Sequence, residues 1–218
     1  MKINRAPETK GVHDMVISNN LQSRSVTLEL PEGELVLQTN CPSWLIESLK
    51  TDRELRAFAR QPDREHRRLL EIARHAENSL ALAYTTAGII IGQITMAPVD
   101  GWWPQMAQAY EIAFEVSPLW RKRGVAHQLL TLLLEEEHIE DMIILALGLS
   151  SHWDIERVGL SPARYREMLM HFLAHHGFMD YITSEPNIRM EPYNVLLARI
   201  GTRVPLETTL QFYHDLVS

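Results

Sequence analysis

Cysteine is almost absent from the 218-residue sequence: Cys41 is the only one, so no internal disulfide can form. This excludes a disulfide-stapled secreted domain and predicts a reducing compartment in which Cys41 is unreactive. No run approaches the roughly 20 apolar residues of a membrane-spanning helix, and the first twenty residues lack the apolar core of a secretion signal. The sequence therefore predicts a soluble cytoplasmic protein with no membrane attachment.

Positive charge is also scarce. The chain has 21 Lys and Arg against 28 Asp and Glu, a formal net charge of −7, and no basic stripe follows any long segment. General nucleic-acid binding needs clustered cations to displace counterions, so we do not expect nucleic acid as a partner. His171 and His175 lie four residues apart, and we interpret them as solvated side chains near a helix end. No metal site is predicted.

Apolar residues are plentiful, at 45% of the chain, which suffices for one well-buried core. Alternating apolar and polar positions predict strands at 25–30 and 33–39 around a turn. Further strands are predicted at 79–86, 89–99, 109–116, 141–149 (a buried strand), 179–184 and 193–201. Helical spacing predicts helices at 43–49, 62–76, 124–138, 161–178 and 205–217. This order predicts a flexible segment at 1–22 and then one α/β domain over 23–218. Its mixed, mostly antiparallel sheet would be flanked by helices.

Three cations stand at the start of the helix predicted from residue 124. Arg121, Lys122 and Arg123 precede Gly124 in the stretch "EVSPLWRKRGVAHQLL" at 115–130. A helix N-terminus already carries roughly half a positive charge, so additional cations are unfavourable there without an anion. Glycine allows a backbone conformation that other residues resist and lets a ligand approach closely. The pattern therefore predicts an anion site, with a plain basic surface turn as the alternative.

The backbone of this turn supplies donors as well as charge. The first N–H groups of a helix have no acceptor within it and point outward, where together with the dipole they bind phosphate. The four residues concerned are Gly124, Val125, Ala126 and His127. Ala126 is small enough to leave the approach open. We expect this turn to bind a phosphate group, with Arg121 and Arg123 adding charge at its rim.

The spacing Arg121-x-x-Gly124-x-Ala126 resembles the acyl-CoA pyrophosphate signature of the GNAT acetyltransferases. Its context resembles that family too, because a strand precedes it and strand, helix, "HHGF" and two strands follow. Over about residues 80–200 the resemblance implies the second half of the GNAT fold. It also implies acetyl-CoA lying across a splayed pair of strands, with the pantetheine paired to backbone near Phe114 and Val116.

A narrower resemblance, over roughly residues 45–205, is to the acetoin-utilisation type of GNAT protein. It rests on short strings, among them "HWD" at 152–154, "YREM" at 165–168, "SEP" at 184–186 and "LLARIG" at 196–201. This resemblance implies a protein lysine acetyltransferase that acetylates and inactivates acetyl-CoA synthetase. Two alternatives stay open: acetylation of a small amine or polyamine, which the acidic charge balance would favour, and a non-catalytic acyl-CoA-binding regulator. Homo-oligomer formation also stays open.

Amine acetylation needs a base. A free lysine with a pKa of about 10.4 is neutral at pH 7 only about once in 2,500 molecules, a cost of about 4.6 kcal/mol. Glu111 and Glu115 lie four apart in the strand predicted at 109–116, so both project to the same face. A carboxylate beside the thioester can take the proton directly or through water. Either residue, or both, is the predicted base, and the alternative is a face that meets water or an arginine.

The loop after the strand predicted at 141–149 carries three candidate substrate residues, His152, Trp153 and Asp154. Asp154 could orient His152, and loops at strand ends often carry binding residues. The alternative is a loop anchored by its tryptophan. Many GNAT enzymes have a tyrosine as general acid shortly before "GF" in the helix predicted here at 161–178. Leu173 stands at that position, so the resemblance leaves the proton donor unassigned.

Overall fold

The structure is a computed structural model that describes residues 23–99, 101–103, 106 and 108–217. The segment predicted to be flexible, 1–22, lies outside the described residues. In the described part the elements follow the predicted order closely. The strands are β1 (Ser25–Leu30), β2 (Gly33–Gln38), β3 (Lys50–Thr51), β4 (Ser79–Thr85), β5 (Ile89–Pro98), β6 (Ala109–Val116), β7 (Ile143–Gly148), β8 (Met179–Tyr181) and β9 (Val195–Ile200).

Helices connect most of these strands. They are α1 (Ser43–Ser48), α2 (Pro62–Arg74), α3 (Val125–Leu134), α4 (Ile155–Val158), α5 (Pro162–Ala174), α6 (Pro186–Arg189) and α7 (Leu206–Asp215). The hydroxyl of Ser161 caps α5 by accepting the backbone N–H of Arg164 at 3.3 Å, and Pro162 occupies its first position. This is the predicted start of that helix, because a capping hydroxyl satisfies an otherwise unpaired N–H.

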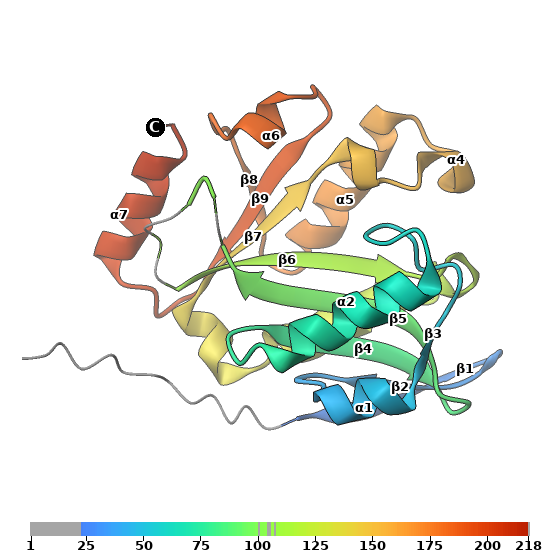
Figure 1. Ribbon diagram of the computed structural model, residues 1–218. Helices are drawn as coiled ribbons and strands as arrows, with labels where there is room; N and C mark the ends of the chain where they lie inside the picture. The colour runs from blue at the N-terminus through green and yellow to red at the C-terminus, as the bar shows by residue number, and fades with distance from the viewer. Residues whose placement is uncertain (1–22, 100, 104–105, 107, 218) are drawn as a thin grey trace, which may run out of the picture.

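The strands form one sheet in the order β1-β2-β4-β5-β6-β7-β9-β8, with β3 paired to β5. Pairing is parallel only for β6 with β7 and β3 with β5, and antiparallel for the other strand pairs of the described chain. The predicted fold class, a mixed and mostly antiparallel sheet flanked by helices, is thus confirmed. Figure 1 shows the N-terminal strands and the C-terminal strands meeting where β6 lies beside β7.

Both faces of the sheet are covered. Helices α3 and α5 pack on one face, around Leu129, Ile112 and Leu173. Helices α1 and α2 cover the N-terminal half of the opposite face, and α6 and α7 cover its C-terminal half (Figure 1). Cys41 is buried beneath α1 and α2, and burial raises the pKa of its thiol to about 12. The thiol is therefore protonated and unreactive near neutral pH, as predicted.

Three short elements were not predicted, and several helices are shorter than predicted; α5, for example, ends at Ala174 and not at 178. The unpredicted elements are β3, α4 and α6, each four residues or fewer. The helix predicted at 124–138 ends at Leu134, and the chain continues as a 3₁₀ turn, Glu137–Asp141. Just beyond the end of this helix, the buried carboxylate of Glu136 accepts two hydrogen bonds from Asn40, both at 2.9 Å. Among the described residues, no helix is long and apolar enough to cross a membrane.

Candidate active site

The candidate site lies where β6 and β7 separate. The two strands pair only from Ala109 to Glu111 on β6 and from Ile143 to Leu145 on β7. Beyond this point β6 continues to Val116, paired with β5, while β7 continues to Gly148, paired with β9. Because parallel strands normally share a continuous ladder, the early end of pairing opens the sheet at the carboxyl ends of both strands. The resemblance to GNAT enzymes implies a splay at this place.

The predicted phosphate turn lies at one side of this opening. Gly124 precedes the first residue of α3 with φ of 76°, a left-handed conformation that favours glycine. A Cβ added there would meet no atom within 4 Å, so the space above the turn is open. No side chain caps α3, which leaves its first N–H groups, those of Val125, Ala126 and His127, facing outward. The turn therefore has the backbone geometry that the sequence predicted for an anion site.

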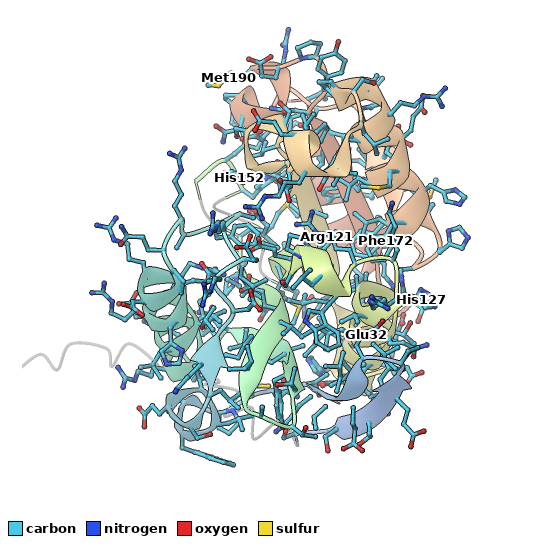
Figure 2. The ribbon with its side chains drawn as sticks, turned by 90° about the vertical axis from the view of Figure 1, so that its right-hand side faces the viewer. Glu32, Arg121, His127, His152, Phe172 and Met190 are labelled. Atoms are coloured by element: carbon cyan, nitrogen blue, oxygen red, sulfur yellow. The ribbon has the colours of Figure 1, made fainter. Side chains whose placement is uncertain are left out.

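Two of the three cations at this turn are already paired with carboxylates, whereas we expected them to add charge at its rim. The guanidinium of Arg121 donates to the backbone oxygen of Val116 at 2.8 Å and to Oδ2 of Asp154 at 2.7 Å. Arg123 forms an ion pair with Glu32 of the β1–β2 turn. Of the three, only Lys122, exposed and at φ 61°, has no ion pair within the described part of the chain. Arg121 thus connects the end of β6 to the segment after β7 (Figure 2).

Glu115 is held in a nearly closed environment at the end of β6. Its side chain is 7% exposed, and Oε1 accepts the backbone N–H of Arg56 at 2.7 Å and of Ala57 at 3.0 Å. Oε2 is buried and has no hydrogen-bond partner in the described structure. Burial raises the pKa of Glu115, and the two backbone hydrogen bonds only partly offset this effect. Such a carboxylate is a stronger base than an exposed one and has one oxygen left to use.

Glu111 differs from Glu115 in its surroundings. The two residues face the same side of the sheet, because Glu111 pairs with Ala97 and Glu115 with Gln93 in one antiparallel register. Glu111, however, is half-buried and lies where β6 and β7 are still joined. The shared face was predicted correctly from spacing. Glu115 differs from Glu111 in being more deeply buried and in lying beyond the end of the β6–β7 pairing, a difference that spacing alone did not reveal.

A buried polar network joins α2 to β5, the strand that pairs with β6 at Glu115. The carboxylate of Glu65 is fully buried and accepts from Arg68 at 2.6 Å and from the amide of Gln93 at 2.5 Å. The guanidinium of Arg68 also lies over the ring of Phe58, 4.8 Å from its centroid. Loop 52–61 is therefore fixed at both of its sides, by α2 and by Glu115. Sequence reasoning missed this loop and network because their contacts join residues far apart in the chain.

The predicted substrate residues lie at the other edge of the opening, but not in the predicted arrangement. Asp154 pairs with Arg121, and with Arg157 at 4.0 Å, and it does not orient His152 in the described structure. The ring of His152 instead meets the ring of Phe58 edge-on, 6.0 Å between centroids. His152 and Phe58 thus bring loop 52–61 against the segment after β7.

Tyr165 of α5 lies beside the predicted substrate residues, a placement that the sequence did not reveal. Its ring stacks on Trp153 at 5.0 Å between centroids. Burial raises the pKa of its phenol, and the charges of Arg121, Asp154 and Glu115 all act on it. A protonated phenol near those groups can donate a proton. Leu173, at the position where GNAT enzymes often have a tyrosine, is fully buried in the core. The only sequence signal was the "YREM" string.

Histidines near the turn form a pair rather than a metal site. Nδ1 of His127 lies 3.0 Å from Nε2 of His176, at the end of α5. Burial lowers the pKa of His176, and His127 lowers it further. His171 and His175 stack edge-on at 4.5 Å between ring centroids, on the exposed side of α5. The residues described contain no group of three or more His, Cys, Asp or Glu that could hold a metal ion.

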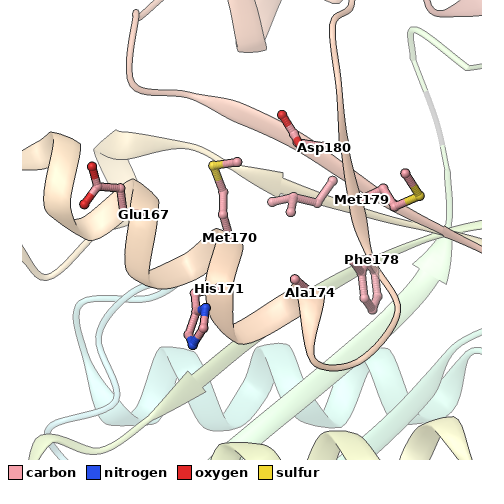
Figure 3. A pocket seen from close by; sticks show the side chains of 8 residues that line it. Glu167, Met170, His171, Ala174, Phe178, Met179 and Asp180 are labelled. Atoms are coloured by element: carbon pink, nitrogen blue, oxygen red, sulfur yellow. The ribbon is translucent and has the colours of Figure 1, made fainter.

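A separate hollow lies away from the strand opening. It has a volume of about 470 Å³ and lies between α5 and β8, where Met170, His171, Phe178 and Met179 help to line it (Figure 3). None of its lining residues belongs to the predicted site. The strand opening, with the turn and Glu115 beside it, is the better candidate because it brings backbone donors and a titratable carboxylate together.

Comparison with known proteins identifies the family of the chain. A family model described as the acetyltransferase (GNAT) family matches residues 44–147. The chain is 28% identical to an acetoin utilization protein AcuA from Bacillus subtilis over 200 residues, covering 87% of this chain and 94% of that protein. It is 30% identical to AcuA from Bacillus licheniformis over 164 residues, covering 73% and 77%.

One solved structure matches almost throughout. The acetoin utilization protein from Exiguobacterium sibiricum has a TM-score of 0.85 and 29% identity, covering 90% of this chain and 94% of that one. GNAT enzymes take acetyl-CoA as co-substrate, so the resemblance noted in the sequence is confirmed at the level of family and reaction type. The chain belongs to the GNAT acetyltransferase family, and it is an acetyl-CoA-dependent N-acetyltransferase homologous to the AcuA acetoin utilization proteins.

Proposed function

We propose that the protein acetylates a lysine of acetyl-CoA synthetase and thereby inactivates that enzyme, as part of acetoin utilisation. The single structural observation that supports it most is Glu115, a buried carboxylate with one unpartnered oxygen at the end of a splayed strand. The choice of acceptor follows the homology to the acetoin utilization proteins. The proposed role in acetoin utilisation follows from the name of these relatives.

In the proposed complex, acetyl-CoA occupies the opening between β6 and β7. Its pyrophosphate accepts hydrogen bonds from the α3 turn at Gly124, Val125, Ala126 and His127, with Lys122 as the available cation. Its pantetheine pairs with the β6 backbone near Phe114 and Val116. Arg121 and Arg123 act mainly on the shape of this site, because each is already paired with a carboxylate.

The transfer step requires one base and one acid. Oε2 of Glu115, directly or through a water, accepts the proton of the lysine ammonium, and the neutral amine attacks the thioester carbon. The nitrogen–carbon bond forms, the carbon–sulfur bond breaks and the thiolate leaves, while the nitrogen gives up its second surplus proton to water and becomes the amide. Tyr165 donates its phenolic proton to the thiolate, because its raised pKa keeps it protonated until it is needed. His152 and Trp153 border the side from which the acceptor enters.

Loss of synthetase activity follows from the chemistry of the product. Acetylation removes the positive charge of a lysine and two of its hydrogen-bond donors. A synthetase that needs this lysine charged in its own active site stops working once it is modified.

The test mixes the purified protein with purified acetyl-CoA synthetase and acetyl-CoA. Synthetase activity should fall in step with acetylation of one lysine, followed by mass spectrometry of its peptides. The Glu115→Gln variant is the control, because it separates enzymatic transfer from spontaneous acetylation by the thioester. A synthetase that stays unmodified while spermidine is acetylated rapidly would assign the protein to the small amines instead.

A further inference from the structure

The outer surface of α2 and the loop before it carries unpaired positive charge on an acidic protein. Residues 53–71 contain six arginines and four acidic residues, although the whole chain has a formal net charge of −7. Four of the arginines are exposed and form no ion pair within the described residues, a set called here the α2 arginine surface: Arg53, Arg60, Arg64 and Arg67.

The α2 arginine surface differs from the rest of the molecule, where exposed arginines are mostly paired with carboxylates. Most other arginines at the surface have a carboxylate within reach, such as Arg24 with Glu135 at 3.3 Å and Arg203 with Asp141 at 2.8 Å. Two acids near the α2 arginine surface are already engaged, because Glu65 is buried against Arg68 and Glu54 is shared between Arg56 and Arg157. Two others, Asp63 and Glu71, lie on α2 among the arginines. Four arginines against these two carboxylates leave the surface with a net positive charge.

This surface borders the side of the active site from which an acceptor would enter. The loop that carries Arg53 and Arg60 gives Glu115 the backbone N–H groups of Arg56 and Ala57. Between those two arginines lies Phe58, whose ring contacts Arg68 on one side and His152 on the other. A protein bound at Glu115 through a lysine would thus extend over the start of α2.

A small hollow lies within the surface. It is lined by Arg64, Arg67, Arg68 and Glu71 and has a volume of about 260 Å³. Small-molecule pockets usually measure roughly 300–1,000 Å³ and are mostly apolar, so this hollow suits a side chain of a partner better than a whole metabolite. Arginine forks bind carboxylates with two parallel hydrogen bonds, which makes Asp or Glu the complementary side chain.

We infer that the α2 arginine surface binds an acidic patch on the acceptor protein, beside the lysine that is acetylated. This inference rests on the proposed function, in which the acceptor is a protein lysine. An acidic protein fits better than nucleic acid for two reasons. The overall charge of −7 repels a long polyanion more than it repels a small acidic patch. Asp63 and Glu71 are also interspersed among the arginines, whereas nucleic-acid binding needs clustered cations that displace many counterions.

The experiment uses two synthetic peptides, each with a single lysine, flanked by glutamates in one and by glutamines in the other. At low salt we expect the parent protein to acetylate the glutamate peptide with about tenfold higher kcat/KM, because complementary charge raises the association rate. The preference should disappear in the double variant Arg64→Glu/Arg67→Glu and shrink at high salt for the parent. Arg24→Glu/Arg189→Glu, with the same change in charge at remote exposed positions, should keep it.

Fluorescence anisotropy with the labelled glutamate peptide separates this inference from the proposed function. If neither peptide is acetylated but the parent binds the glutamate peptide and the Arg64→Glu/Arg67→Glu variant does not, the surface is supported while lysine transfer fails. Equal acetylation of both peptides by the parent, or no binding of the glutamate peptide, overturns the inference. A single-stranded oligonucleotide of equal charge that binds this surface more tightly than the peptide also overturns it, in favour of nucleic acid.

Discussion

The two sides of the candidate site are built in different ways. On one side, the turn at 117–127 is encoded by consecutive residues, and its glycine, cations and helix start are visible in the sequence. On the other side, loop 52–61 reaches the site only through the fold, because Arg56 precedes Glu115 by 59 residues in the chain. The first side supplies donors for an anion, and the second encloses the proposed base. Local patterns therefore predict the proposed co-substrate site, whereas the chemical environment of the carboxylate depends on contacts between distant residues.

The largest effect is expected on the turn side, from Gly124→Glu. The new side chain would place bulk and negative charge where the pyrophosphate is proposed to bind, and calorimetry should detect no acetyl-CoA binding. Gly101→Glu is the matched control, since Gly101 also has a positive φ, of 61°, and open space around its Cα. Both variants cost similar backbone strain. Unchanged acetyl-CoA affinity in a folded Gly124→Glu protein would contradict the assignment of the turn.

The second-largest effect is expected for Glu115, the proposed base, which loop 52–61 encloses. Glu115→Gln keeps the shape but removes the proton acceptor, so kcat should fall by about 10²–10⁴-fold while acetyl-CoA affinity changes little. Glu111→Gln is the comparison, and it should retain most of its activity because this residue lies where the strands are still paired. Equal losses in the two variants would remove the distinction between the two carboxylates.

The pH dependence of the reaction tests the proposed role of Glu115 independently. A base works only when ionised, so kcat/KM should fall as the pH drops through the pKa of Glu115, which burial raises above the usual value for a glutamate. This acid limb should disappear from the residual activity of Glu115→Gln. A limb that persists unchanged in that variant would belong to another group.

Tyr165→Phe should have a smaller effect than loss of the base. Removing the phenol leaves the stack on Trp153 but takes away the proposed proton donor, and water can replace it in part. We expect a fall in kcat of about 10²-fold, at the low end of general acid catalysis, with the KM for acetyl-CoA little changed. Leu173→Phe, in the core, tests packing alone and should lower stability rather than the rate of the folded protein.

The smallest effect concerns stability, far from the opening. Hydrogen bonds from the backbone of Thr202 and from Arg199 lower the pKa of Glu140 to about 2. A carboxyl with a depressed pKa stabilises the fold above its unfolded value near 4.5, and this contribution is lost as the pH falls towards 2. Glu140→Gln should therefore lower the free energy of unfolding by on the order of 1 kcal/mol at pH 7, after solvent screening.

Urea denaturation at pH 7 and near pH 2.5 measures that difference, which should shrink at the lower pH. Glu137→Gln, in the same 3₁₀ turn but exposed, is the control and should be neutral at both values. A stability difference of equal size at both pH values would mean that the charge of Glu140 plays no part.

Much of the fold followed from the sequence because its long elements carry strong periodicity. Strand β6 and helix α5 were predicted to within a few residues, and so was the shared face of Glu111 and Glu115. The ion pair of Arg121 with Asp154 was not predictable, since it joins two loops that meet only in the folded sheet. The position of Tyr165 beside Trp153 was missed for the same reason, because the stacking depends on the fold and not on a motif. Local patterns were therefore predictable from the sequence, and tertiary contacts were not.

Hydrogen–deuterium exchange with and without acetyl-CoA tests most directly whether the strand opening is the co-substrate site. The account predicts slower exchange at the amides of 112–116 and 124–127 when acetyl-CoA is added, and no change around the α5–β8 hollow near Phe178 and Met179. The Gly124→Glu protein should show no protection at either place. Protection confined to the α5–β8 hollow, with unchanged exchange at the opening and the turn, would contradict the assignment.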